Sequence, residues 1–227
     1  MFEGFPRDSI QFFKDLANNN NRDWFAKNKT RYENVVLNPA LELVTEMAEP
    51  LKKISRHFVA VPKKSGGSLM RIYRDTRFSK DKTPYKLNLG VQFRHEFGKD
   101  VHAPGFYFHL DAEKIFVGAG IWRPNSKTLN AIRRHIDDNP RRWKRTKNTK
   151  AFKSTFELHS ESLKRPPRGY QAEHPLIADL KLKNHIGLVP LQREDIFSRS
   201  LIDTLSMNFK TAMPYVRFLC DSIPLPS

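Results

Sequence analysis

LNLGVQFRHE (residues 87–96) and GFYFHLDAEKIFVGAGIW (residues 105–122) are the stretches that decide the fold class of this chain. Apolar and polar side chains alternate in both, which is the two-residue period of a half-buried β-strand. The connection at residues 111–114 is too short for a crossover helix, so the strands should be antiparallel. The predicted apolar face consists of Leu87, Leu89, Val91, Phe93, Phe106, Phe108, Leu110, Ile115, Val117, Ala119 and Ile121.

The opposite face of these strands combines polar side chains with glycine. Asn88, Gln92, Tyr107 and His109 lie on it, and three glycines add no side chain: Gly90, Gly118 and Gly120. Glycine inside a strand often marks a place where a ligand or another backbone comes close. Two interpretations stay open at this point. The face is the floor of a cleft, or the glycines admit a packed helix or record bulges.

Together with a strand predicted over residues 69–74, these stretches form an antiparallel sheet of four or more strands, about 68–122. Apolar residues at helical spacing predict helices over 8–18, from about 22, over 39–51, over 126–137 and over 197–219. Met213-Pro214 predicts a kink or break in the last of these. We therefore expect an α+β fold, with N-terminal and C-terminal helices flanking the sheet, in a single domain of residues 1–227.

Composition restricts the class of protein and of partner. Cys220 is the single cysteine of the 227 residues, so no internal disulfide is expected, and neither a signal peptide nor a membrane span is expected from these residues. We expect a cytoplasmic protein with no membrane partner. The net charge of +16 points to phosphate-bearing partners. Most of the excess lies in residues 71–86 and 123–153.

Residues 71–86, RIYRDTRFSKDKTPYK, are called the basic segment below; they hold six cations and two aspartates. Arginine forks and lysine charges bind phosphate or carboxylate well. The leading hypothesis is that an anionic, phosphate-bearing ligand binds in a cleft between the polar sheet face and this segment. The predicted ligand-binding residues are Arg71, Arg74, Asp75, Arg77, Lys80, Asp81, Tyr85, Lys86, Tyr107 and His109. The alternative is an internal ion-pair network in which Asp75 and Asp81 orient the arginines.

Two other functions are compatible with the residues. A nucleic-acid-binding module would use the basic segment together with residues 123–153, whose run at 141–150 places an aromatic among cations. Its contact residues would be Arg141, Arg142, Trp143, Lys144 and Arg145, although charge runs are also common on solvated faces. An enzyme acting on a phosphorylated substrate would use His109 as acid or base. No metal-ligand spacing is present, so neither a metal nor a cofactor is predicted.

Several motifs together resemble a known family. They are NNRDWF at 20–25, the whole basic segment, Gly118 to Gly120 with Arg123-Pro124, RPPRGY at 165–170 and HPL at 174–176. This combination is similar to the bacterial and fungal family labelled domain of unknown function 2461, and it spans nearly the whole chain. The resemblance implies a single full-length domain and supplies no activity. The run at 141–150 is no part of the family pattern.

Overall fold

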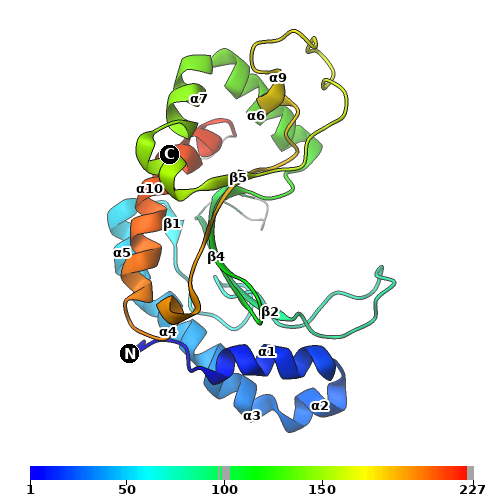
Figure 1. The fold of residues 1–227 in the computed structure, drawn as a ribbon, viewed down its shortest axis with the longest axis vertical. Helices are drawn as coiled ribbons and strands as arrows, with labels where there is room; N and C mark the ends of the chain where they lie inside the picture. Colours follow the sequence, from blue (N-terminus) through cyan, green and yellow to red (C-terminus); the bar gives the residue numbers. More distant parts are fainter. Residues whose placement is uncertain (97, 99–102, 224–227) are drawn as a thin grey trace.

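The computed structural model describes residues 1–96, 98 and 103–223 and shows an α+β fold built on an antiparallel sheet (Figure 1). Within these residues the sheet has six strands in the order β1-β2-β3-β4-β6-β5, and helices precede and follow it in the chain. The strands are β1 (Phe58–Val59), β2 (Asn88–His95), β3 (Gly105–Asp111), β4 (Ile115–Ile121), β5 (Glu157–His159) and β6 (His185–Pro190). The predicted fold class is confirmed.

The helices predicted from periodicity are present, with several differences. The helix predicted from about 22 is interrupted at Asn28, the last helix begins at Leu201, and the sequence did not predict the short helices at 140–147, 150–155 and 177–180. Asn21 caps the second helix and Asn125 caps the sixth, each accepting a hydrogen bond from a backbone N–H. The predicted helix over 39–51 is interrupted at Met47, and the last helix continues through Pro214 without a break. Pro214 and Lys210 are exposed, so the carbonyl of Lys210, which loses its N–H partner, can bond to water. The helices are α1 (Asp8–Asn18), α2 (Arg22–Lys27), α3 (Lys29–Tyr32), α4 (Asn38–Glu46), α5 (Ala48–Ile54), α6 (Ser126–Asp138), α7 (Pro140–Lys147), α8 (Lys150–Thr155), α9 (Ile177–Leu180) and α10 (Leu201–Asp221), with a π-helical turn η1 (Glu33–Leu37) and a 3-10 turn η2 (Arg193–Ile196).

The register of the sheet confirms the two predicted faces. Val91 lies opposite Phe108, which lies opposite Val117, and all three are fully buried. Their face is covered by helices: the Phe209 ring of α10 stacks on Phe106, with ring centres 4.5 Å apart. Leu87 is the exception, because it precedes β2 and is 41% exposed.

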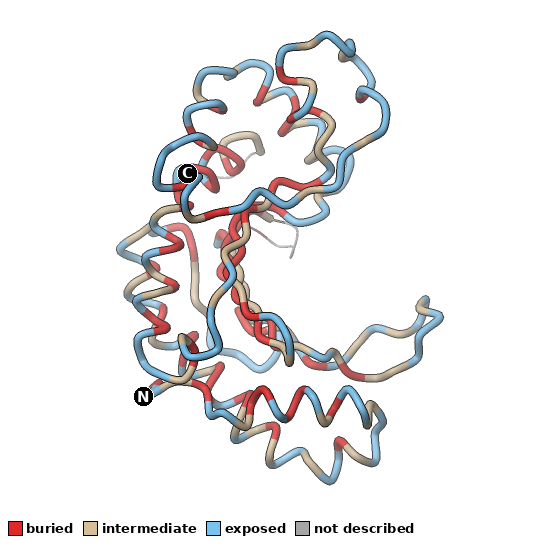
Figure 2. The backbone as a smooth tube through the Cα atoms, viewed as in Figure 1, coloured by how far each residue is buried: buried red, intermediate tan, exposed pale blue. Residues whose placement is uncertain are grey.

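The other face of the sheet is open. Figure 1 shows α5 and α10 on one side of the sheet, and no described helix over the middle of the opposite side. Helices α1 to α3 lie at one end of the long axis of the molecule, and α6, α7 and α9 lie at the other end. Figure 2 shows buried residues along the sheet and along α10, whereas the basic segment is exposed or intermediate over most of its length. The polar, glycine-bearing face is therefore the accessible one.

The predicted strand over 69–74 is wrong. Only isolated bridges form there, Leu69 with Val91 and Tyr73 with Tyr85. Residues 71–74 do not pair with β2, because this part of the chain pairs with residues 84–86 instead. Arg74 N–H donates to Pro84 O at 2.9 Å, and Lys86 N–H donates to Ile72 O at 2.7 Å. The basic segment is thus a long loop that projects from the body of the molecule (Figure 1).

None of the described helices combines the length and the apolar character that crossing a membrane requires.

Candidate ligand-binding site

A cavity of about 470 Å³ lies on the open face of the sheet. Its walls are mainly rings and aliphatic side chains, and no Lys, Arg, Asp or Glu is among the described residues that line it. The lining includes the side chains of Met70, Tyr107, His109, Phe116, Trp122 and Leu188. This space is called the sheet cavity. It contains Tyr107 and His109, two of the predicted site residues.

The three strand glycines are present for different reasons. A Cβ on Gly118 would make only ordinary contacts, 3.4 Å from Leu188 Cδ2 and 3.5 Å from Tyr107 Cβ, so no close approach requires glycine at this position of the cavity floor. A Cβ on Gly90 would lie 2.6 Å from the Tyr107 hydroxyl and 3.1 Å from Met70 Sδ. Gly120 has φ +126° and approaches the His185 carbonyl oxygen too closely for any side chain. The cavity at Gly118 is consistent with the cleft interpretation, whereas Gly90 and Gly120 admit a tyrosine hydroxyl and the backbone of a neighbouring strand, and the register through all three glycines has no bulge.

His109 is the centre of a hydrogen-bonded chain. Its Nε2 lies 2.8 Å from Asp111 Oδ2, and its Nδ1 lies 3.1 Å from the Tyr107 hydroxyl. The ring also stacks on Phe116, with centres 4.4 Å apart and planes at 13°. Asn88 Nδ2 lies 3.5 Å from the same Nδ1. These contacts orient the imidazole and occupy both of its nitrogens.

The protonation of this chain follows from its surroundings. Burial and the charge of Asp111 raise the pKa of Tyr107 to about 12, despite a hydrogen bond from Asn88 that lowers it. Burial opposes ionisation of Asp111, but hydrogen bonds from His109 and from the backbone N–H groups of Lys114 and Glu113 bring its pKa below the ordinary value. Tyr107 therefore keeps its proton, and its hydroxyl and the Asp111 carboxylate each hold one ring nitrogen of His109, with the donor and acceptor roles set by the tautomer of the imidazole.

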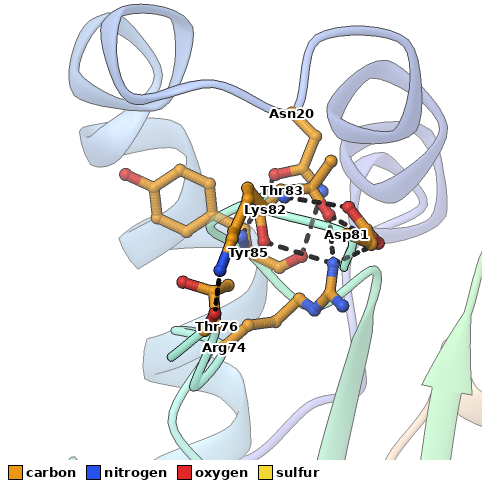
Figure 3. Close-up of polar contacts among 7 residues, drawn as sticks. All are labelled: Asn20, Arg74, Thr76, Asp81, Lys82, Thr83 and Tyr85. Atoms are coloured by element: carbon orange, nitrogen blue, oxygen red, sulfur yellow. Dashed lines mark hydrogen bonds and ion pairs between the residues drawn. The ribbon is translucent and has the colours of Figure 1, made fainter. Parts of the chain in front are cut away.

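The cations of the basic segment do not reach this cavity. The segment is held by its own ion pairs: Arg74 with Asp81, and Arg77 with Asp75. Figure 3 shows Arg74 reaching Asp81 and Thr83, and Lys82 donating to the Thr76 carbonyl at 2.9 Å. The hydrogen bonds lower the pKa of both aspartates to about 2; for Asp75 the main donor is Arg77, and for Asp81 it is the Thr83 backbone. The predicted internal network is present.

The other residues predicted for the anion site are dispersed. Arg71 and Lys80 are exposed. Lys86 is half-buried, and burial, with a smaller effect of nearby Arg71, lowers its pKa. Tyr85 lies against α2, where its ring stacks on Phe25 with centres 4.0 Å apart. Among the predicted ligand-binding residues within the described chain, only Tyr107 and His109 line the sheet cavity.

The residues predicted for nucleic-acid contact lie on α7. Trp143 is fully buried, with its ring centre 5.1 Å from that of Phe218, so it cannot stack on a base. Arg142 pairs with Asp221 of α10. Arg141, Lys144 and Arg145 are exposed. In Figure 1, α7 and the basic segment lie toward opposite ends of the long axis, so they do not form one continuous stripe.

Sequence reasoning missed Arg123, the residue after the cavity-lining Trp122. Arg123 has φ +45°, an unusual value for a residue other than glycine, and its N–H donates to Asn184 Oδ1 at 2.7 Å. Its guanidinium carbon lies 5.2 Å from the centre of the Trp122 ring. A cation therefore stands beside a ring of the cavity wall. The sequence feature that could have indicated Arg123 is the Arg123-Pro124 pair, which is one of the motifs that resemble the family.

Within the described chain, no group of three or more His, Cys, Asp or Glu side chains is arranged to hold a metal ion.

Comparison with curated proteins found no match, and comparison with solved structures found none either. A family model, described as conserved hypothetical protein DUF2461, matches residues 8–218. The match includes the α2 motif, the basic segment, the cavity strands and most of α10. The chain belongs to the DUF2461 family.

Proposed function

We propose that the protein binds a small organic anion in the sheet cavity, with a planar apolar body between the rings and its anionic group beside Arg123. The observation that carries the proposal is a ring-walled cavity with no charged lining among the described residues and one cation at its edge. The proposed ligand is anionic, as the sequence predicts. Its charge would be met by Arg123 and not by the basic segment.

The walls favour a flat, apolar ligand body. A volume of about 470 Å³ is within the range of small-molecule pockets, which are mostly apolar with a few placed polar groups. Burial of apolar surface contributes roughly 25 cal/mol per Å². The Tyr107 hydroxyl, oriented by His109, is the placed polar group here. Gly118 leaves room above the floor, so the ligand can approach the strand closely.

The backbone at Arg123 supports a role in function. A left-handed conformation in a residue other than glycine costs roughly 1–3 kcal/mol, and such residues cluster at ligand sites. Here Asn184, which is buried, holds the Arg123 N–H. The guanidinium is exposed and lies near Trp122, where a ligand can pair with it. Strain that places a cation at the edge of an uncharged cavity is consistent with anion recognition.

Two matched dyes test the proposal. Anilinonaphthalene sulfonate is a flat aromatic anion, and phenylnaphthylamine is the same skeleton without the sulfonate. We expect both to bind with a rise in fluorescence, and Gly118→Val to weaken both, because the added methyl groups fill the cavity floor. Arg123→Asn removes the charge with a residue that tolerates positive φ. It should weaken the sulfonate about tenfold, as expected for a charge-assisted contact, and leave the neutral dye unchanged.

Arg141→Gln is the control, because it removes an exposed cation of α7 that is remote from the cavity. Melting temperatures identify variants that lose structure. Unchanged binding of both dyes to Gly118→Val would contradict the sheet cavity as the site. Equal weakening of both dyes by Arg123→Asn, at unchanged melting temperature, would contradict the role of Arg123.

The two other functions are weaker proposals. Nucleic-acid binding loses support because Trp143 is buried and the two basic stretches are separated. Catalysis by His109 loses support because both ring nitrogens have partners, so a substrate would first have to displace Tyr107 or Asp111. A binding role for the cavity needs no such displacement.

A further inference from the structure

A second hollow, of about 440 Å³, lies between the start of the helical region and the basic segment. It is called the α2 groove. Its lining includes three cations from three parts of the chain, Arg22 of α2, Lys29 of α3 and Arg74 of the basic segment. Tyr73 and Tyr85 form a wall, and neither Asp nor Glu is among its described lining residues. We infer that the α2 groove binds a phosphate group.

The walls of the groove are held by contacts that need no ligand. The Asn20 amide bonds both backbone polar groups of Tyr85: its Nδ2 donates to Tyr85 O at 3.0 Å, and its Oδ1 accepts from Tyr85 N–H at 3.1 Å (Figure 3). The Tyr85 ring stacks on Phe25 at 18°. The Tyr73 ring lies next to Tyr85, with centres 5.5 Å apart. The basic segment and α2 are thus joined before any ligand arrives.

Arg74 is oriented and still has donors to offer. In the described chain its side-chain hydrogen bonds, to Asp81, to the Thr83 carbonyl and to the Thr83 hydroxyl, are all made by Nη1. Asp81 also accepts from Thr83 N–H at 2.9 Å, and it pairs with Arg74 from outside the lining of the groove. Nε and Nη2 of Arg74 remain for a ligand, which is the fork that binds phosphate.

The other two cations are exposed and adjacent to the same wall. Arg22 is close enough to Tyr85 to lower the pKa of its phenol, although burial and the nearby Tyr73 raise that pKa overall. Lys29 is exposed at the start of α3, directly after Asn28, the residue that follows α2. In the described chain neither Arg22 nor Lys29 has an ion-pair partner. Two arginines and a lysine around one hollow without a carboxylate are suited to a dianionic phosphate.

Phosphate titrations read by melting temperature test this inference. The probes are inorganic phosphate and phenyl phosphate, with ionic strength held constant by chloride. We expect both to raise the melting temperature in a saturable way. Arg22→Gln and Lys29→Gln should each weaken the response at least fivefold. Lys27→Gln is the matched control, because Lys27 is an exposed cation of the same helix that does not line the groove. Arg74→Gln is unsuitable, since it would also release the basic segment.

The results separate the possible sources of the phosphate. Tighter binding of phenyl phosphate would indicate an aromatic or nucleoside ester packed on Tyr73 and Tyr85, and equal binding would indicate free phosphate. Gly118→Val should leave these titrations unchanged, so the outcome is independent of the sheet cavity. Equal weakening by Lys27→Gln and Arg22→Gln would show diffuse charge and overturn the inference. Absence of any saturable response to either probe would overturn it as well.

Discussion

At the scale of single residues, one residue type serves several physical purposes in this protein. Gly118 lines the cavity where a side chain would fit without a clash, Gly90 admits the Tyr107 hydroxyl, and Gly120 adopts a backbone conformation that L side chains rarely adopt. Sequence pattern alone treats these three as equivalent. Only their surroundings separate them, because a Cβ has a different neighbour at each position.

His185 is the residue whose ionisation should affect stability most clearly. It is fully buried beside Trp143, neither ring nitrogen has a hydrogen-bond partner among the described residues, and burial lowers its pKa to about 4. Asp179 opposes this shift, while Arg133 and Lys147 add to it. In the unfolded chain the pKa is 6.5. Protons therefore bind the unfolded state preferentially between these values, and stability is lost as pH falls below 6.5.

We expect this group alone to lower the free energy of unfolding by about 2 kcal/mol between pH 7 and pH 5. Urea unfolding of the native protein and of His185→Phe at both pH values measures it. The variant should lose less stability on acidification by that amount, since phenylalanine fills a similar volume and does not titrate. Identical pH dependence in both proteins would contradict the assignment.

At the scale of elements, the conformation of the basic segment depends on contacts within the segment and on one remote contact. Its own ion pairs shape the loop, but Asn20 fastens it to the helical region. The alternating pattern at 69–74 is locally compatible with a strand. The backbone hydrogen bonds to residues 84–86 instead close the loop on itself.

Asn20→Ala should loosen this loop, because it removes both side-chain bonds to the Tyr85 backbone. Loss of roughly 1–1.5 kcal/mol corresponds to about a tenfold larger open population. Trypsin should therefore cut within residues 71–86 several times faster, which mass spectrometry of the first fragments detects. Asn18→Ala is the control, since Asn18 is an exposed asparagine at the end of α1, two residues before Asn20. Equal cleavage rates in the two variants would contradict the clamp.

At the scale of the whole molecule, one hydrophobic core joins both ends of the chain. It extends from Phe2 and Phe5 through the sheet to Phe218 and Cys220. Phe5 stacks on Phe108 of β3, and Phe209 of α10 stacks on Phe106 of the same strand. Elements far apart in sequence therefore stabilise one another through the sheet.

This continuous core predicts a single cooperative unfolding transition. Urea unfolding followed by far-ultraviolet circular dichroism and by tryptophan fluorescence should give coincident midpoints. The fluorescence reports all three tryptophans: Trp24, near α1, Trp122, at the sheet cavity, and Trp143, near α10. A fluorescence midpoint that differs from the dichroism midpoint would indicate two independently folding units and contradict a single domain.

Much of the fold was predictable because strand patterns are local. The alternation in 87–122 determined the two faces and the antiparallel pairing of three strands. Strands β5 and β6 carried no such signal: all three residues of β5 are exposed, and β6 includes Gly187 and ends at Pro190. They join the sheet through backbone hydrogen bonds to distant strands, which no local pattern encodes.

The sequence by itself determined the fold class, the apolar and polar faces of the sheet, and the motifs of the family. Only the tertiary structure decided which side chains meet. It buried Trp143 within a basic run, separated the cations of 71–86 from Tyr107 and His109, and placed Arg123 beside the cavity. The reason is physical: the period of a strand is set by neighbouring residues, whereas convergence of charges depends on how loops and helices from distant parts of the chain pack.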